Sequence, residues 1–120
     1  MTDLLIESKT VEDRLRRALP TDVDYASVRL HDERSEHLRV RRNELEPIFT
    51  DFDSGVMFSI WNGGGLGYAA TADLSEEGLA AAVEQARQWA AITAGAMVTT
   101  AAPTDHASGI YRSPVAVDWD

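Results

Sequence analysis

Apolar and polar residues alternate in five short stretches of the first two thirds of the chain. A period of two places every second side chain on the same face, which is typical of a β-strand with one buried face. The sequence therefore predicts about five antiparallel strands in succession. The stretches are residues 25–31, 36–41, 44–50, 55–61 and 66–71.

The first two of these strands are expected to form a hairpin. Keeping the apolar side chains on one face pairs Leu30 with Leu38 and Val28 with Val40, because a slip of one residue would expose the whole apolar set. This register leaves residues 33–35 as a three-residue loop.

Turn residues separate the next strands. Residues 42–43, Arg-Asn, suit a two-residue turn that pairs Val40 with Leu45. Pro47 cannot donate a hydrogen bond to a strand ladder, so a bulge or break is expected there. Residues 51–54 are expected to form another turn.

A helix is predicted before the strands. Leu4, Val11, Leu15 and Ala18 recur at a spacing of three to four residues or its multiples, with charged residues between them. This spacing places apolar side chains on one face of a helix. Pro20 is expected to end it.

A second helix is predicted after the strands. Asp73 lies three residues before Glu76, as at the start of a capped helix, and Gly95 suits its C-terminal cap. Its apolar stripe consists of Leu79, Ala82, Val83, Ala86 and Ala90. Two amphipathic helices can cover one face of an antiparallel sheet, so an α+β domain in the order α-β-β-β-β-β-α is expected over residues 1–95, with 96–120 as an extended linker.

Composition and charge narrow the function classes. Eleven basic and twenty acidic residues give a net charge of −9, which disfavours nucleic acid and anionic membranes as partners. The chain contains no cysteine, which excludes disulfides and cysteine-based zinc sites. No signal peptide or membrane-spanning run is recognisable, so the expected compartment is the cytoplasm.

Histidines are the first place to look for chemistry. The expected hairpin would bring His31 opposite His37, with carboxylates nearby, and this pair is the candidate for a zinc site. The alternative is a solvated polar strand face, and the lack of any ligand spacing favours it. The zinc-hydrolase motifs HExxH and HExxxH are both absent from the sequence.

A glycine run raises a second possibility. Residues 62–65, Asn-Gly-Gly-Gly, resemble part of a phosphate-binding loop, but the required lysine is missing and a strand pattern follows instead of a helix. A hairpin turn explains the run better.

An outward-facing surface is the candidate interface. In the expected register Arg29, Arg39 and Arg41 share the polar face with Met57 and Trp61. Exposed Trp and Met beside arginines suit a docking surface for an acidic partner or a peptide carboxylate. The alternative is that neighbouring carboxylates neutralise the arginines on a solvated face.

Several stretches, taken in order, resemble the N-terminal domain of the TldD/PmbA proteins, once called modulators of DNA gyrase. The resemblance covers roughly residues 4–95, and the tail after residue 110 is closer to the TldD type. The stretches that carry it are residues 24–29, 36–46, 55–71, 73–79 and 111–118.

This resemblance implies a role but no catalytic residue in the present chain. TldD-type subunits are zinc metallopeptidases of small or unfolded peptides, and they pair with metal-free PmbA-type subunits. Their zinc ligands lie in a C-terminal domain, through an HExxxH motif, and no such position exists here. The expectation is a non-catalytic domain that forms subunit interface and chamber wall, cut off from its C-terminal domain at Asp120. A stand-alone peptide- or protein-binding module is the alternative.

Overall fold

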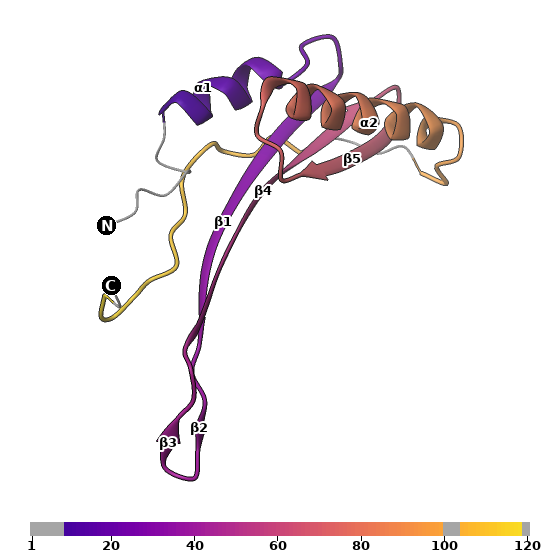
Figure 1. Ribbon diagram of the computed structural model, residues 1–120. Coiled ribbons are helices and arrows are strands. Elements are labelled where there is room, and N and C mark those ends of the chain that lie inside the picture. Colours follow the sequence, from indigo (N-terminus) through magenta and orange to yellow (C-terminus); the bar gives the residue numbers. More distant parts are fainter. Residues whose placement is uncertain (1–8, 100–103, 119–120) are drawn as a thin grey trace.

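The computed structural model of the protein describes residues 9–99 and 104–118 (Figure 1). Its order of elements confirms the predicted α+β arrangement with a helix at each end of five antiparallel strands. The part of the first predicted helix that precedes Lys9 lies outside the described residues. The elements are α1 (Lys9–Ala18), β1 (Tyr25–His37), β2 (Val40–Arg41), β3 (Glu44–Leu45), β4 (Phe49–Asn62), β5 (Gly65–Thr71) and α2 (Glu76–Ala94).

The strands form two separate antiparallel sheets. The larger has the order β1-β4-β5, and the smaller contains only β2 and β3. Both helices lie on one face of the larger sheet, with α2 across β4 and β5 and α1 beside α2 (Figure 1). We call this three-stranded part with its two helices the body.

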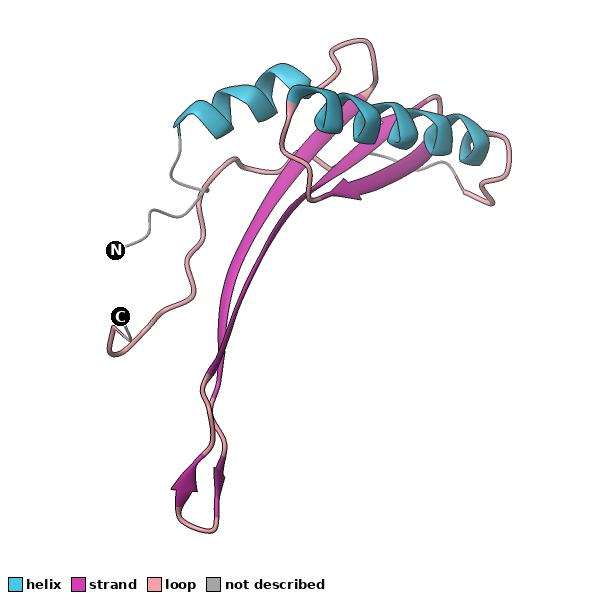
Figure 2. Ribbon diagram, viewed as in Figure 1, coloured by secondary structure: helices cyan, strands magenta, loops and turns pink. Residues whose placement is uncertain are grey.

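A long two-stranded ribbon projects from the body. Strand β5 ends at Thr71, opposite Val56, but β1 and β4 continue to pair as far as His37 and Phe49. The small β2–β3 sheet lies at the far end of this ribbon (Figure 2). We call residues 31–55 the arm, residues 38–48 its tip, and the two strand segments before and after the tip its stem. The radius of gyration is 18.6 Å, against roughly 14 Å for a compact domain of this length.

The core lies between the sheet and α2. Val56, Phe58 and Ile60 alternate along β4 and are 2%, 0% and 0% exposed. The apolar stripe predicted for α2 faces them and is buried as expected. Leu15 of α1 completes the cluster. The alternation of β4 and the helical stripe were thus sufficient to predict the core.

Glycines allow α2 to approach β5 closely. A Cβ atom on Gly67 would lie 2.1 Å from the carbonyl oxygen of Ala86, and one on Gly65 would lie 2.0 Å from that of Ala90. Both distances are far below van der Waals contact. Only glycine therefore fits these two positions of β5 in the observed packing.

The cap of α2 lies two residues later than predicted. Ser75 is the N-cap, and its Oγ accepts a hydrogen bond from the Gly78 amide at 3.0 Å. Asp73 instead accepts a hydrogen bond from the Ser75 amide through Oδ1, also at 3.0 Å. The C-cap at Gly95 is confirmed.

The predicted first hairpin is wrong. Residues 33–35 are part of β1, and this strand pairs with β4, so that Leu30 lies opposite Val56 and Val28 opposite Phe58. Alternation shows which residues of a strand share a face, but more than one partner strand can be paired with the apolar residues on that face. The pattern therefore did not identify the partner strand. The longer ladder with β4 also removes the turn predicted at residues 51–54, which lie within β4.

The turn predictions elsewhere are confirmed. Arg42 and Asn43 have φ values of 53° and 61°, and Val40 pairs with Leu45 as expected. The chain leaves regular strand structure around Pro47, between β3 and β4. Gly63 and Gly64, both with positive φ, form the turn between β4 and β5.

No helix in the described part of the chain is both long enough and apolar enough to cross a membrane.

Candidate interaction surface

The structure separates the five residues predicted to form one docking face. Arg29 and Met57 are cross-strand partners in the body, and Trp61 lies further along the same face of β4. Arg39 and Arg41 instead lie in the tip of the arm. Arg39 and Arg41 are separated from Arg29 because their segment does not pair with the strand segment that carries Arg29, as the predicted hairpin required.

The three residues in the body lie on the sheet face opposite the helices, which we call the open face. There the ring of Trp61 meets that of Tyr25 edge to face, with centroids 5.6 Å apart. The hydroxyl of Tyr25 accepts a hydrogen bond from the backbone amide of His106 at 3.4 Å. The segment after α2 therefore contacts the open face at this aromatic pair.

A shallow hollow of about 570 Å³ lies where the arm leaves the body. Arg29, His31 and Met57 line it, together with Asp53 and the end of β5. Gly55 adds no side chain at this point. The hollow combines a cation and a thioether with an acidic neighbour, which suits binding of a polar chain segment.

The two candidate zinc ligands do not share a site. His31 and His37 lie on the same strand, six residues apart, which corresponds to about 20 Å in an extended chain. The Nε2 of His31 lies 3.2 Å from Glu33 Oε2, and the ring of His37 packs near that of Phe49. The described residues contain no group of three or more His, Cys, Asp or Glu side chains placed to hold a metal ion. Within the described residues neither histidine therefore belongs to a metal-binding group of this kind.

Hydrogen bonds within the arm favour the ionised form of Glu33. The hydrogen bond from His31, and next that from Ser35, hold the pKa of Glu33 below its usual value. Glu33 also lies directly opposite Asp53 in the strand register. Two carboxylates thus face each other across the stem.

The arm exposes a large apolar surface that the sequence did not predict. Leu38 and Val40 were expected to face a core, and both are instead 66% exposed. Phe52 lies within the turn that was wrongly predicted and Phe49 lies just before it, so two phenylalanines in a polar stretch were the available signal. All six large apolar residues of the arm are more than half exposed: Leu38, Val40, Leu45, Ile48, Phe49 and Phe52.

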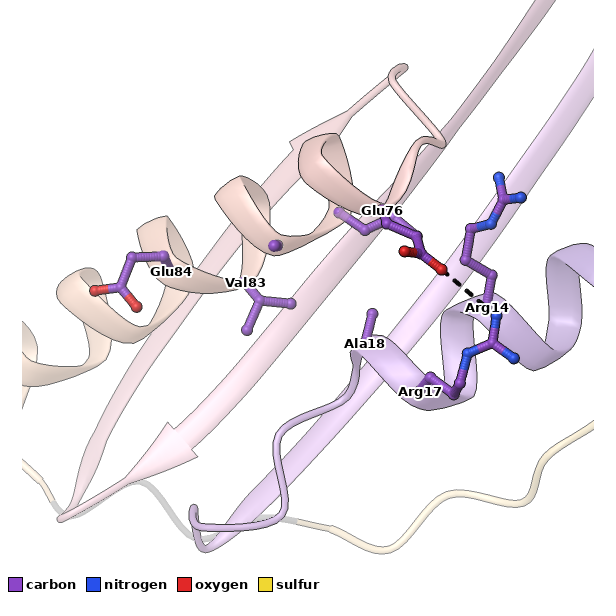
Figure 3. A pocket seen from close by; sticks show the side chains of 8 residues that line it. Arg14, Arg17, Ala18, Glu76, Val83 and Glu84 are labelled. Carbon is purple, nitrogen blue, oxygen red and sulfur yellow. Dashed lines mark ion pairs between the residues drawn. The ribbon is translucent and has the colours of Figure 1, made fainter.

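A second groove, of about 420 Å³, separates α1 from α2 (Figure 3). Arg17 of α1 and Glu76 of α2 approach to 3.8 Å across it, and Arg14 donates to the carbonyl oxygen of Leu74 at 2.9 Å. The ion pair joins the two helices, and the hydrogen bond joins α1 to the loop before α2. The groove brings together no nucleophile and base, so we assign it to helix packing.

Fold and surface together define the class: an α+β domain with a projecting strand arm that exposes six large apolar side chains. A family model described as PmbA/TldA metallopeptidase domain 1 matches residues 26–90, which run from β1 through the arm to α2. The chain belongs to this family, as the resemblance in the sequence predicted. A search of curated proteins found no significant match.

Proposed function

We propose that this chain is a non-catalytic first domain of a zinc metallopeptidase that degrades small or unfolded peptides in the cytoplasm. In this proposal the domain contributes part of the subunit interface and part of the wall of the substrate chamber. The observation that carries the proposal is the arm, which projects from a well-packed body and exposes six large apolar side chains. Exposed apolar patches of this kind mark contact surfaces.

The family supports the peptidase context. Its description names a metallopeptidase and numbers this region as the first domain. We therefore place the peptide-cleaving chemistry and its zinc in a C-terminal domain outside this chain. The partner subunit would be of the PmbA or TldD type, and the surface contacted would be the arm.

The first test compares the chain alone with the assembled peptidase, meaning this domain joined to its catalytic domain and partner subunit. Zinc content and peptide hydrolysis are measured on both. We expect the chain alone to be folded and inactive, and the assembly to bind zinc and cleave peptides. Chelator-sensitive hydrolysis by the chain alone would contradict the proposal.

A variant then tests the arm itself. Phe49→Asp with Phe52→Asp places charges in the exposed apolar surface and is expected to weaken assembly at least about tenfold while leaving the body folded. Ile92→Asp, compared with each arm substitution made singly, is the control, because Ile92 is also exposed, at 61%, but lies on α2. An assembly that tolerates the arm variant as well as the control would rule out the arm as the interface.

A stand-alone binding module is the second candidate, and two observations favour it. The hollow beside Arg29 and His31 lies at the base of the arm, and β5 has a free edge, since it is the last strand of its sheet. An extended peptide can add to such an edge. Saturable binding of unfolded peptides by the chain alone, lost in Arg29→Glu, would favour this function.

A further inference from the structure

The hollow at the base of the arm is lined by an arginine that has no partner in the described part of the chain. The other arginines of the body each contact a carboxylate or a carbonyl oxygen: Arg14, Arg16, Arg17 and Arg87. Arg29 makes no ion pair or hydrogen bond with a described residue. A guanidinium carries five donors in a geometry that matches a carboxylate. Arg29 is therefore available to an anionic group from solution.

An aspartate in the same hollow is also without a partner. Asp53 lines the hollow and forms no ion pair or hydrogen bond with a described residue. The other basic side chain of the hollow, His31, already contacts Glu33, with its Nε2 3.2 Å from Oε2. Glu33 lies directly opposite Asp53, and opposed like charges destabilise a strand pair. A cation bound at Asp53 would reduce this repulsion.

The strand register holds these two opposite charges apart on one face of the sheet. Arg29 lies opposite Met57, and Asp53 comes four residues before Met57 on β4, which corresponds to about 13 Å of strand. Because this separation is even, both side chains are on the same face. Gly55 lies between them on β4 and adds no side chain to the hollow. The hollow therefore has a positive end, a negative end and a floor of backbone between them.

A short peptide with both ends free has the matching charges, an α-carboxylate at one end and an α-ammonium at the other. An extended chain spans about 3.3–3.6 Å per residue, so two or three residues span roughly 7–11 Å. The volume of about 570 Å³ is within the usual range for small ligands, roughly 300–1,000 Å³. Met57 is 40% exposed, and its flexible thioether can adapt to different ligand side chains.

We propose that the hollow at the base of the arm binds di- and tripeptides by both of their free ends, with the carboxylate at Arg29 and the ammonium at Asp53. This inference deepens the proposed function and rests on it for the source of the ligand, because a peptidase releases such fragments. A longer extended chain cannot place both of its ends in the hollow at once. The site therefore selects short products over long unfolded substrates.

Dipeptides with blocked ends test the proposal on the full chain. Alanyl-alanine is titrated while the backbone amide signals are followed by NMR, and saturable shifts are expected for the residues that line the hollow. Acetylation removes the ammonium of the ligand and amidation removes its carboxylate, so each is expected to raise the dissociation constant at least about tenfold. The proposal is overturned by the absence of saturable shifts up to about 10 mM ligand, or by a ligand block at either end that leaves binding unchanged.

Two variants assign each ligand end to its residue. In Arg29→Gln, amidation of the ligand is expected to have no further effect while acetylation still weakens binding; in Asp53→Asn, the reverse is expected. Arg41→Gln and Asp51→Asn are the matched controls, because both residues lie in the arm outside the lining of the hollow, and they are expected to leave binding unchanged. Effects of variant and block that simply add would overturn the assignment. Circular dichroism checks that each variant is folded.

The failure of this inference differs from the failure of the proposed function. Dipeptide binding is measured on the chain alone, whereas the proposed function is tested by zinc content, hydrolysis and the arm variants in the assembly. If the dipeptide does not bind and the assembly behaves as expected, only this inference is wrong. If the dipeptide binds by both ends and the assembly is inactive, the binding site stands and the peptidase context is wrong.

Discussion

The body and the stem of the arm share strands β1 and β4, yet the two regions differ in burial. Within β4, Phe58 is 0% exposed while Phe52, six residues earlier on the same face, is 66% exposed. The strand pairing continues through both regions without interruption. Burial is therefore decided by what lies above the ribbon: α2 covers the body, and nothing in the described chain covers the arm.

The boundary between the regions follows from close packing in the body. Gly65 and Gly67 on β5 and the small alanines of α2 bring helix and strand into backbone contact. Strand β5 ends at Thr71, opposite Val56. Beyond this point the ribbon has only two strands, so its apolar side chains depend on another molecule or domain.

The largest expected effect comes from comparing two phenylalanines. Phe58→Ala removes a fully buried ring from the core and is expected to lower the free energy of unfolding by about 3–5 kcal/mol. Phe52→Ala makes the same chemical change in the arm and is expected to cost less than about 1 kcal/mol in the monomer. Denaturant unfolding of both variants at a concentration where the chain is monomeric checks this. Equal losses would show that the arm shares the stability of the body.

Two glycines sharpen the role of close packing. Gly67→Ala would force a Cβ to 2.1 Å from a carbonyl oxygen of α2, so we expect a loss of about 3 kcal/mol in unfolding free energy. Gly95→Ala is the matched control, since a Cβ there meets nothing within 4 Å and the backbone φ is −90°. Thermal unfolding of the two variants side by side gives the comparison. A Gly67→Ala protein as stable as the control would mean that α2 does not lie on β5 as described.

The smallest expected effect is on acid stability. The hydrogen bond with Arg87 lowers the pKa of Asp22, and the closest contact between the two side chains is 2.5 Å. A carboxyl with a depressed pKa in the folded state stabilises the protein above its unfolded pKa, near about 3.9, and loses this contribution as pH falls through the folded value. Asp22→Asn is therefore expected to flatten the stability profile below about pH 4.

The arm supplies the control for this titration. Glu33 also has a lowered pKa, but its partner His31 lies in the arm as well. If the arm unfolds before the body, Glu33→Gln is expected to leave the free energy of global unfolding at acid pH unchanged. Unfolding curves from pH 2 to 6 for both variants test this. A change for Glu33→Gln as large as that for Asp22→Asn would show that the arm and the body unfold as one cooperative unit.

Most of the body was predictable from the sequence. The alternation of residues 55–61, the glycine turn after Asn62 and the apolar stripe of α2 each define local geometry, and all three are confirmed. The family was also recognisable from the order of its stretches. The cap of α2 was placed at Asp73 instead of Ser75, because both are good caps and the choice depends on tertiary contacts.

The arm was not predictable by the same reasoning. The alternating pattern predicts one buried face and so places Leu38 and Val40 in a core, but both side chains are 66% exposed. Alternation shows that a strand has an apolar face but does not show whether that face is covered within the same chain. The docking residues were divided between body and arm for a related reason, because strand pairing depends on long-range packing that short patterns do not contain.

Hydrogen exchange of the backbone amides, measured on the chain alone and on its assembly with a partner subunit, tests most directly the claim that the arm depends on a partner surface and the body does not. In the body, amides of residues 56–62, β5 and α2 are expected to be protected equally in both samples. In the arm, amides of residues 31–37 and 49–54 are expected to exchange rapidly in the monomer and to gain protection as association proceeds. Arm amides as protected as those of the body in a monomeric sample would contradict the account.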